Sequence, residues 1–413
     1  MIEKKIDFWV RHIDELNTLW NNAEITAASV KKRYFSGKKY LGSKDKKVVG
    51  GCFYFSLRTR LFTETVSIHE LLYLAYLHVT EVKESVDKLL KNIDILEFIS
   101  SYIDSVEDLV TNFDAKKNTF FFPQVYLENI YSKNVDLNEL CKSLNEEATT
   151  DLRILSNRDV IEEELTATDI PYSRNLLNGC LKLKKNINFN NYISYKNGYF
   201  DIQDEGSQLV SYFLNPMPDD SILDYCSGGG GKTLHIAELA EDRANIVATD
   251  IDIKRLKETE RRVSFHRYAS VRIMNKEDVD SDTKQYDKIL VDAPCSGSGT
   301  VRRSPDIRYS ITADSISTYA ALQLEILEKC YSKLNVGGEL VYSTCSLFTR
   351  ENDDVVLSFL KNHNDITQIN IRDRVIGLQL DPDRFDFTDA GLMTMTHKTN
   401  TDGFYISVLT KEA

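Results

Sequence analysis

The sequence is short of the residues that interrupt or crosslink a chain: among 413 residues there are 7 prolines, 18 glycines and 7 cysteines. So few prolines and glycines, beside 42% hydrophobic residues, exclude a disordered or linker-rich protein. The cysteines form no CxxC pair and lie near no histidine cluster, so neither a disulfide framework nor a metal site is predicted. Reduced thiols of this kind are typical of a cytoplasmic protein.

Long apolar runs and an excess of positive charge are absent as well. No stretch approaches the roughly 18 apolar residues that a membrane helix requires, and the charged N-terminus is not a signal peptide, so no membrane partner is expected. A net charge of −12 argues against general binding to nucleic acid, and no DNA partner is expected. Local charge differs: residues 31–47 hold eight lysines and arginines against one aspartate, which is either an RNA contact or a solvated surface.

The chain is long enough for two or three domains. Residues 1–135 repeat apolar positions at three and four residues and predict a helical domain. Residues 136–200 break into shorter pieces and predict a small α/β module, whereas residues 201–413 alternate strands with helices and predict a doubly wound parallel sheet. In such a sheet ligands bind at the carboxyl ends of the strands, so the loops after the strands are expected to carry the chemistry.

One of these loops, "DYCSGGGGKT" at residues 224–233, allows two interpretations. Gly231, Lys232 and Thr233 supply the end of a Walker A phosphate loop, but Cys226 stands where its first glycine belongs. The segment is therefore either an altered triphosphate loop or a different glycine-rich turn. The strand "DKILVD", which ends at Asp292, resembles a Walker B segment and keeps the first interpretation open.

The next strand favours the second interpretation. Asp250 ends that strand 19 residues after Gly231, where an acid accepts hydrogen bonds from a ribose diol. A nicotinamide fingerprint fails, because Thr233 stands at the sixth position counted from Gly228. A glycine turn with a ribose acid also describes sites for S-adenosylmethionine, in which Asp278 would take the adenine amino group. The expected cofactor contacts are Cys226, Ser227, Gly228, Gly229, Gly230, Gly231, Lys232, Asp250, Asp278 and Asp292.

Two cysteines follow strands in loops rich in serine, glycine and threonine. Cys295 lies in "DAPCSGSGT" and Cys345 in "LVYSTCS", so both thiols are expected at the same edge of the sheet as the glycine turn. Little apolar packing is available there, which favours a chemical role. The other thiols are expected to be core residues, with the loop residue Cys226 beside the cofactor; the expected core set is Cys52, Cys141, Cys180 and Cys330.

At these motifs the sequence resembles the RsmB/Nop/Sun family of RNA cytosine-C5 methyltransferases, in its bacterial ribosomal RNA branch. The resemblance covers about residues 195–413 through "NGYFDIQDEGSQLV", "DYCSGGGGKT", "DAPCSGSGTVRRSPDIRY", "LVYSTCSLFTRENDDVV" and "DGFYISVL". Residues 31–58 are similar, more loosely, to a NusB-like helical domain. One difference concerns the cofactor loop, where Ser227, Gly228 and Gly229 replace the usual Ala-Ala-Pro, which lowers its rigidity.

The resemblance implies a Rossmann-like class I methyltransferase that uses S-adenosylmethionine on RNA, with ribosomal RNA the first substrate expected and transfer RNA the second. Cys345 would add to C6 of cytosine, Cys295 would assist release, and Asp292 would hydrogen-bond the ring at N3. Lys232 would contact O2 or lower the pKa of a thiol. The arginines of "VRRSPDIRY" would hold phosphates; they are Arg302, Arg303 and Arg308.

A monomer is expected, and the substrate base must be unpaired or extruded. Two alternatives remain open from the sequence. One is an RNA-binding assembly factor without activity, and the other is a P-loop NTPase.

Overall fold

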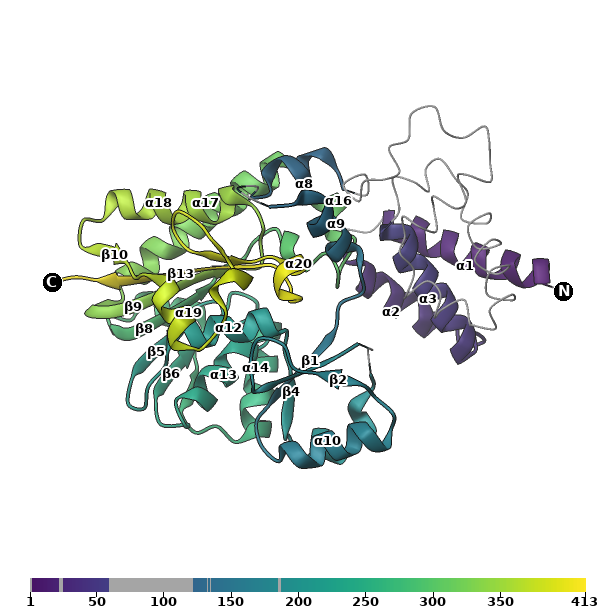
Figure 1. Ribbon diagram of the computed structural model, residues 1–413, viewed down its shortest axis with the longest axis horizontal. Coiled ribbons are helices and arrows are strands. Elements are labelled where there is room, and N and C mark those ends of the chain that lie inside the picture. Colours follow the sequence, from purple (N-terminus) through teal and green to yellow (C-terminus); the bar gives the residue numbers. More distant parts are fainter. Residues whose placement is uncertain (1, 22–24, 59–121, 132, 134, 185–186) are drawn as a thin grey trace. The chain divides into compact units, whose positions relative to one another are not determined.

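A computed structural model describes the chain except for residues 1, 22–24, 59–121, 132, 134 and 185–186, which contain much of the predicted helical region (Figure 1). The chain divides into two units. The N-terminal unit comprises residues 1–128, 132–147 and 300–311, and the C-terminal unit comprises residues 129–131, 148–299 and 312–413. Within the described ranges, no helix has the length and apolar character to cross a membrane.

The N-terminal unit is helical. Its described helices are α1 (Ile2–Asn21), α2 (Ala27–Gly37), α3 (Ser43–Arg58), α8 (Gln124–Asn129), α9 (Leu137–Asn145) and α16 (Ile307–Ser310). Helix α2 begins where the Thr26 side chain accepts a hydrogen bond from the Ser29 backbone, which satisfies a free N–H at the helix start. Helices α1 and α3 pack together through apolar side chains at helical spacing, including the fully buried Ile13 and Phe53.

Residues 300–311 follow the Cys295 loop in the chain and yet belong to this unit. Asp306 accepts a hydrogen bond of 2.9 Å from the Ala27 backbone, and the Tyr309 hydroxyl donates to the Leu57 carbonyl at 2.7 Å. The Arg308 guanidinium is fully buried, donates to Asn145 and stacks 4.1 Å from the centroid of the Phe122 ring. The prediction that Arg308 holds a phosphate is therefore wrong, because its charge is enclosed by protein; Arg302 is only 3% exposed and is excluded on the same ground.

A small antiparallel sheet opens the C-terminal unit. Its strands are β1 (Thr150–Ile154), β2 (Tyr172–Ser173), β3 (Cys180–Leu183) and β4 (Phe200–Ile202), in the order β2-β3-β1-β4. Helices α10 (Arg158–Ala167) and α11 (Ile193–Lys196) accompany it. A separate core lies beneath this sheet, in which Leu152, Leu181 and Phe200 pack with Ile161 and Leu165 of α10. The sheet therefore forms a layer with its own hydrophobic support.

The main sheet has nine strands in the order β11-β12-β13-β9-β8-β5-β6-β7, with β10 pairing to β13. The strands are β5 (Ser221–Asp224), β6 (Asn245–Ala248), β7 (Val271–Ile273), β8 (Tyr286–Asp292), β9 (Leu334–Thr344), β10 (Ile366–Gln368), β11 (Asp386–Phe387), β12 (Leu392–Thr394) and β13 (Phe404–Lys411). Strands β5 to β9 pair in parallel, as predicted, and β10 to β13 add antiparallel pairs at the other end.

Helices cover both faces of this sheet. They are α12 (Glu205–Leu214), α13 (Gly231–Leu239), α14 (Ile253–His266), α15 (Lys276–Ser281), α17 (Ala313–Tyr331), α18 (Asp353–Asn362), α19 (Ile371–Gly377) and α20 (Thr396–Thr399). Figure 1 shows α17 and α18 on one side of the strands and α12 and α13 on the other. Because helices enclose the central strands, these are apolar on both faces, as in the fully buried run Ile289–Val291 of β8.

The strand order reverses beside β5, which pairs with β6 on one side and with β8 on the other. Such a switch point opens a crevice at the carboxyl ends of the two strands, where the connections leave in opposite directions. The glycine turn follows β5 and the Cys295 loop follows β8. The fold therefore brings the two motifs singled out in the sequence to one edge of the sheet.

Candidate active site

The turn after β5 has glycine at two positions where the backbone is left-handed. Gly228 has φ +55° and Gly230 has φ +82°, both in the left-handed region. A Cβ on Gly228 would lie 2.3 Å from the Arg255 guanidinium, and one on Gly230 would lie 2.8 Å from the Thr259 methyl group. Helix α13 begins immediately after the turn, at Gly231. The result is a bare backbone turn against a helix N-terminus.

Side chains from the next strand and helix hold this turn. Asp250, at the end of β6, accepts hydrogen bonds from the backbone of Gly228 at 2.7 Å and of Asp252 at 2.8 Å. Thr259 of α14 donates to the Gly228 carbonyl at 2.9 Å, and Arg262 donates to the Gly229 carbonyl at 2.6 Å. Asp250 thus lies beside the turn, where its sequence position predicts it. Each of its oxygens keeps a second lone pair that a ribose hydroxyl can use.

Several buried polar atoms around the turn have no hydrogen-bond partner among the described residues. They are the hydroxyl of Ser227, one carboxyl oxygen of Asp224 and the amide oxygen of Gln203. Native proteins rarely leave such groups unpaired, so the turn is suited to a polar ligand. Gln203 was not singled out in the sequence, although its amide lies 3.9 Å from the Cβ position of Gly231.

Acidic and basic side chains both lie at the turn, because Asp250 and Asp292 stand beside Lys232, Arg255 and Arg262. Burial, with smaller contributions from the nearby carboxyl groups of Asp292 and Asp250, raises the pKa of Asp224 to about 7. A triphosphate would meet these acids at close range, whereas the positively charged sulfonium and amino groups of S-adenosylmethionine would be attracted to them.

An ion pair joins the glycine turn to the end of β8. Lys232 is 2.7 Å from one oxygen of Asp292, and the Ser343 hydroxyl donates to the other oxygen at 2.9 Å. Ser343 lies beside Asp292 in the register of β8 and β9. The Lys232 ammonium also lies 5.1 Å from the centroid of the Phe404 ring. The structure thus brings Lys232 and Asp292 together.

The two thiols predicted to share this edge are in contact. Cys295 and Cys345 are partly exposed, and their sulfur atoms are 3.4 Å apart. The hydrogen bond to the Cys345 sulfur, together with burial, raises the pKa of Cys295 well above its usual value. The other core assignments are confirmed, since Cys52, Cys141, Cys180 and Cys330 are all buried.

A buried acid of the Cys345 motif, which the sequence alone did not single out, connects the two cysteine loops. Glu351 accepts hydrogen bonds from the Ser296 backbone at 2.8 Å and from the hydroxyls of Ser296 and Ser346 at 2.5 Å each. The Gln323 amide adds a fourth at 3.3 Å. Each serine directly follows a cysteine, so Glu351 holds both thiols at a fixed separation. Only the pairing of loops 50 residues apart reveals this role.

Two further residues were predicted to contact the cofactor, Asp278 and Cys226. Asp278 is exposed on α15, and its described side-chain partner is Asn275 at 3.4 Å. Cys226 lies in the turn, and burial raises the pKa of its thiol well above the ordinary value, so it acts there as a neutral group.

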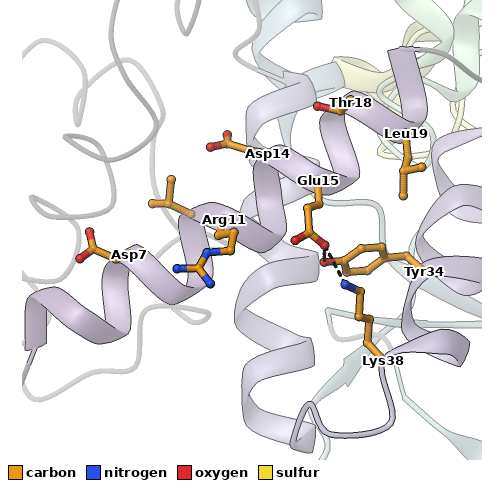
Figure 2. A pocket seen from close by; sticks show the side chains of 9 residues that line it. Asp7, Arg11, Asp14, Glu15, Thr18, Leu19, Tyr34 and Lys38 are labelled. Carbon is orange, nitrogen blue, oxygen red and sulfur yellow. Dashed lines mark hydrogen bonds and ion pairs between the residues drawn. The ribbon is translucent and has the colours of Figure 1, made fainter.

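A separate hollow of about 710 Å³ lies in the N-terminal unit, between α1 and α2. Figure 2 shows Tyr34 and Lys38 pointing toward Glu15, to which they are bonded at 2.6 and 2.9 Å. Lys38 of the basic segment is therefore paired within the protein. Lys39, Lys44 and Lys47 of the same segment are exposed.

Residues 211–410 match the sequence model of a family described as 16S rRNA methyltransferase RsmB/F. The chain is 35% identical over 228 residues to a probable ribosomal RNA small subunit methyltransferase B of Bacillus subtilis, covering 53% of this chain and 49% of that protein. It is 36% identical over 220 residues to the ribosomal RNA small subunit methyltransferase B of Serratia proteamaculans, covering 52% and 48%. The chain spans about half the length of the curated relatives it matches.

Solved structures share the fold. A crystal structure described as PH0851 superposes with a TM-score of 0.74 at 23% identity, covering 98% of both chains. NSun6 from Pyrococcus horikoshii, solved with SFG, superposes with a TM-score of 0.60 at 20% identity, covering 71% of this chain and 99% of that one. The fold and the glycine turn define a Rossmann-like methyltransferase domain. Over residues 211–410 this domain is similar to the 16S rRNA methyltransferase family RsmB/F.

Proposed function

We propose that this protein transfers a methyl group from S-adenosylmethionine to C5 of a cytosine in RNA. Ribosomal RNA is the substrate that we propose, and transfer RNA is the alternative. The observation that carries the proposal is the contact between the thiols of Cys295 and Cys345, beside Asp292 and the glycine turn. The names of the curated relatives support RNA as the substrate class.

The shape and the hydrogen-bonding groups of the turn suit the cofactor. Residues 226–231 would lie along its methionine end, because glycine allows the backbone to approach closely, and Asp250 would accept from the ribose. The unpaired hydroxyl of Ser227 and the amide oxygen of Gln203 offer further hydrogen bonds. When bound, S-adenosylmethionine supplies an electrophilic methyl group. Asp278, exposed on α15 after β7, is the proposed contact to the adenine amino group.

The two thiols divide the covalent chemistry between them. C5 of cytosine is a weak nucleophile until a thiolate adds to C6, which makes the ring electron-rich. The family resemblance gives Cys345 as the thiol that carries out this addition, and the sulfur of Cys295 lies 3.4 Å from it. After methyl transfer, loss of the C5 proton expels Cys345, with Cys295 assisting this release as a base or by relaying the proton.

Asp292 and Lys232 act on the ring charge. As the thiolate adds, negative charge builds at N3 and O2 of the pyrimidine and requires hydrogen-bond donors. Lys232 has three donors and is held by Asp292, which Ser343 fixes from the other side. The ion pair between Lys232 and Asp292 therefore holds a proton donor at a fixed position, where it can stabilise the negative charge that develops on the pyrimidine ring.

The contact between the thiols favours an enzyme over an inactive assembly factor, because a factor that only binds RNA gains nothing from paired reactive groups. A cytosine in a duplex cannot present C6, so the substrate is unpaired or extruded at a cost of a few kcal/mol. The exposed lysines of residues 39–47 are the proposed contacts to the RNA backbone. A cytoplasmic monomer without DNA or membrane partners remains the expectation.

Single-cysteine variants test the mechanism with RNA and S-adenosylmethionine. Cys345→Ala should transfer no methyl group and form no adduct. Cys295→Ala should accumulate a protein–RNA adduct that survives denaturing electrophoresis, because addition and methylation proceed while release is slow. Cys330→Ala removes a core thiol of the same unit and serves as the matched control. An adduct in Cys345→Ala that needs Cys295 would invert the two roles.

The substrate is identified separately. Bisulfite sequencing of total RNA from cells with and without the gene should show one or a few cytosines that lose protection. Protection that is unchanged at every cytosine would refute the proposed activity.

A further inference from the structure

Side chains of a neighbouring helix hold the glycine turn of this chain in place. Its central residues Ser227, Gly228 and Gly229 stand where the resembling family usually has Ala-Ala-Pro, so the backbone has lost the stiffness of a proline. Two consecutive carbonyls of the turn instead accept hydrogen bonds from Thr259 and Arg262, which lie three residues apart on one face of α14. Helix α14 replaces the missing local rigidity with two side-chain contacts.

Arg262 has a second partner on the small sheet. While Nη1 donates to the Gly229 carbonyl, Nη2 is bonded to the carboxyl group of Asp201 on β4. Asp201 also accepts from Arg153 of β1 at 3.3 Å, and Arg153 is ion-paired to Glu238 of α13, the helix that begins at the turn. The side chains of Arg262, Asp201 and Arg153 are 19%, 15% and 2% exposed. Solvent therefore screens these contacts far less than surface ion pairs.

We propose that Arg262 is a positioning residue that fixes the glycine turn against the small sheet, so that affinity for the cofactor depends on the contact between Arg262 and Asp201. The planar guanidinium suits this role because its fork donates in two directions at once, which a lysine ammonium at the end of a flexible chain does not reproduce. Without Arg262, binding must order a turn that contains four consecutive glycines, Gly228 to Gly231, and this cost lowers affinity. The inference rests on the proposed function in one respect, namely that S-adenosylmethionine is the ligand of the turn.

The first experiment measures binding of S-adenosylhomocysteine by calorimetry, which requires neither RNA nor turnover. Arg262→Ala should weaken binding about 10-fold, as expected for the loss of one charge-assisted hydrogen bond that preorganises the site. The matched control is Arg261→Ala on the same helix, because Arg261 is 67% exposed and pairs with Glu258 outside the turn. That control should bind within about 2-fold of the wild type. Arg262→Lys should be intermediate and decides the question if Arg262→Ala fails to fold.

A double-mutant cycle tests the link to the small sheet. Asp201→Asn should weaken binding several-fold, and adding it to Arg262→Ala should cause no further loss, because both changes break the same chain of contacts. With RNA present, Arg262→Ala should raise KM for S-adenosylmethionine while kcat at saturating cofactor stays near the wild-type value. General damage to the fold would instead lower kcat.

The outcomes separate the two proposals. If the wild type binds neither S-adenosylmethionine nor S-adenosylhomocysteine, the proposed function fails. If the wild type binds S-adenosylhomocysteine and both Arg262→Ala and Arg262→Lys bind it with the wild-type affinity, the positioning role fails and the proposed function stands. If the losses of affinity caused by Asp201→Asn and Arg262→Ala are additive, Asp201 does not act on the turn through Arg262.

Discussion

Glu351 offers the sharpest test of how the thiol pair is held. Its buried carboxyl group accepts four hydrogen bonds, three of them from the two residues that follow the cysteines. Glu351→Ala removes this acceptor from all four donors, of which the Gln323 amide keeps its bond to the Pro294 carbonyl. Each buried unsatisfied group costs about 1–3 kcal/mol, and partial relief by water and hydroxyl rotation brings the total to roughly 3–5 kcal/mol.

Glu351→Gln should be far milder. The two hydroxyl donors, Ser296 Oγ and Ser346 Oγ, meet the same carboxyl oxygen, whereas the backbone amide of Ser296 and the Gln323 amide meet the other. A glutamine can place its NH₂ group toward the hydroxyls, which rotate to accept, and keep its oxygen toward the amides. The expected loss is about 1 kcal/mol, because a charge-assisted network becomes a neutral one.

Calorimetric melting of the full chain measures both changes. At about 2–4 °C per kcal/mol for a domain of this size, the alanine variant should melt about 10 °C lower and the glutamine variant about 3 °C lower. Glu325→Ala removes a carboxylate that is 59% exposed and pairs with Lys329, and should shift melting by less than about 2 °C. Methyl transfer by the alanine variant should fall about 100-fold, since a small displacement of reacting groups is that costly. A glutamine variant as unstable as the alanine variant would refute this reasoning.

Three further predictions concern the turn and the basic segment. Asp250→Ala should weaken S-adenosylmethionine binding by roughly 10- to 200-fold, the loss of one or two buried hydrogen bonds; unchanged affinity in calorimetry would remove Asp250 from the site. Burial raises the pKa of Asp224 from 3.8 to about 7, so its contribution to stability is complete below pH 3.8 and is lost as pH rises through 7. The melting temperature of Asp224→Asn, measured relative to that of the wild type, should therefore rise as the pH is raised from 4 to 8. A difference between the two proteins that stays constant across that range would contradict this prediction. Changing Lys39, Lys44 and Lys47 to Gln should flatten the slope of log RNA affinity against log salt by about 0.7–0.9 for each phosphate that these lysines neutralise. A slope equal to that of the wild type would show that these lysines only face solvent.

The sequence by itself determined the kind of fold and most of the chemistry. Alternating strands and helices after residue 200 predicted the parallel strands β5 to β9, because buried parallel strands are short apolar runs between helices. The position of Asp250 and the polar loops around Cys295 and Cys345 predicted one edge of the sheet as the site. These features are local, since each depends on residues near one another in the chain.

Only the tertiary structure decided which of these residues meet and how they are held. A local pattern does not distinguish a buried arginine from an exposed one, so the sequence predicts Arg308 as a phosphate contact although Asn145 and Phe122 enclose it. Glu351 and Arg262 likewise resemble ordinary charged residues until the fold brings their partners from other strands and helices. Their roles arise from contacts across 33 to 61 residues of chain, and such contacts exist only when the strands pair and the helices pack against them.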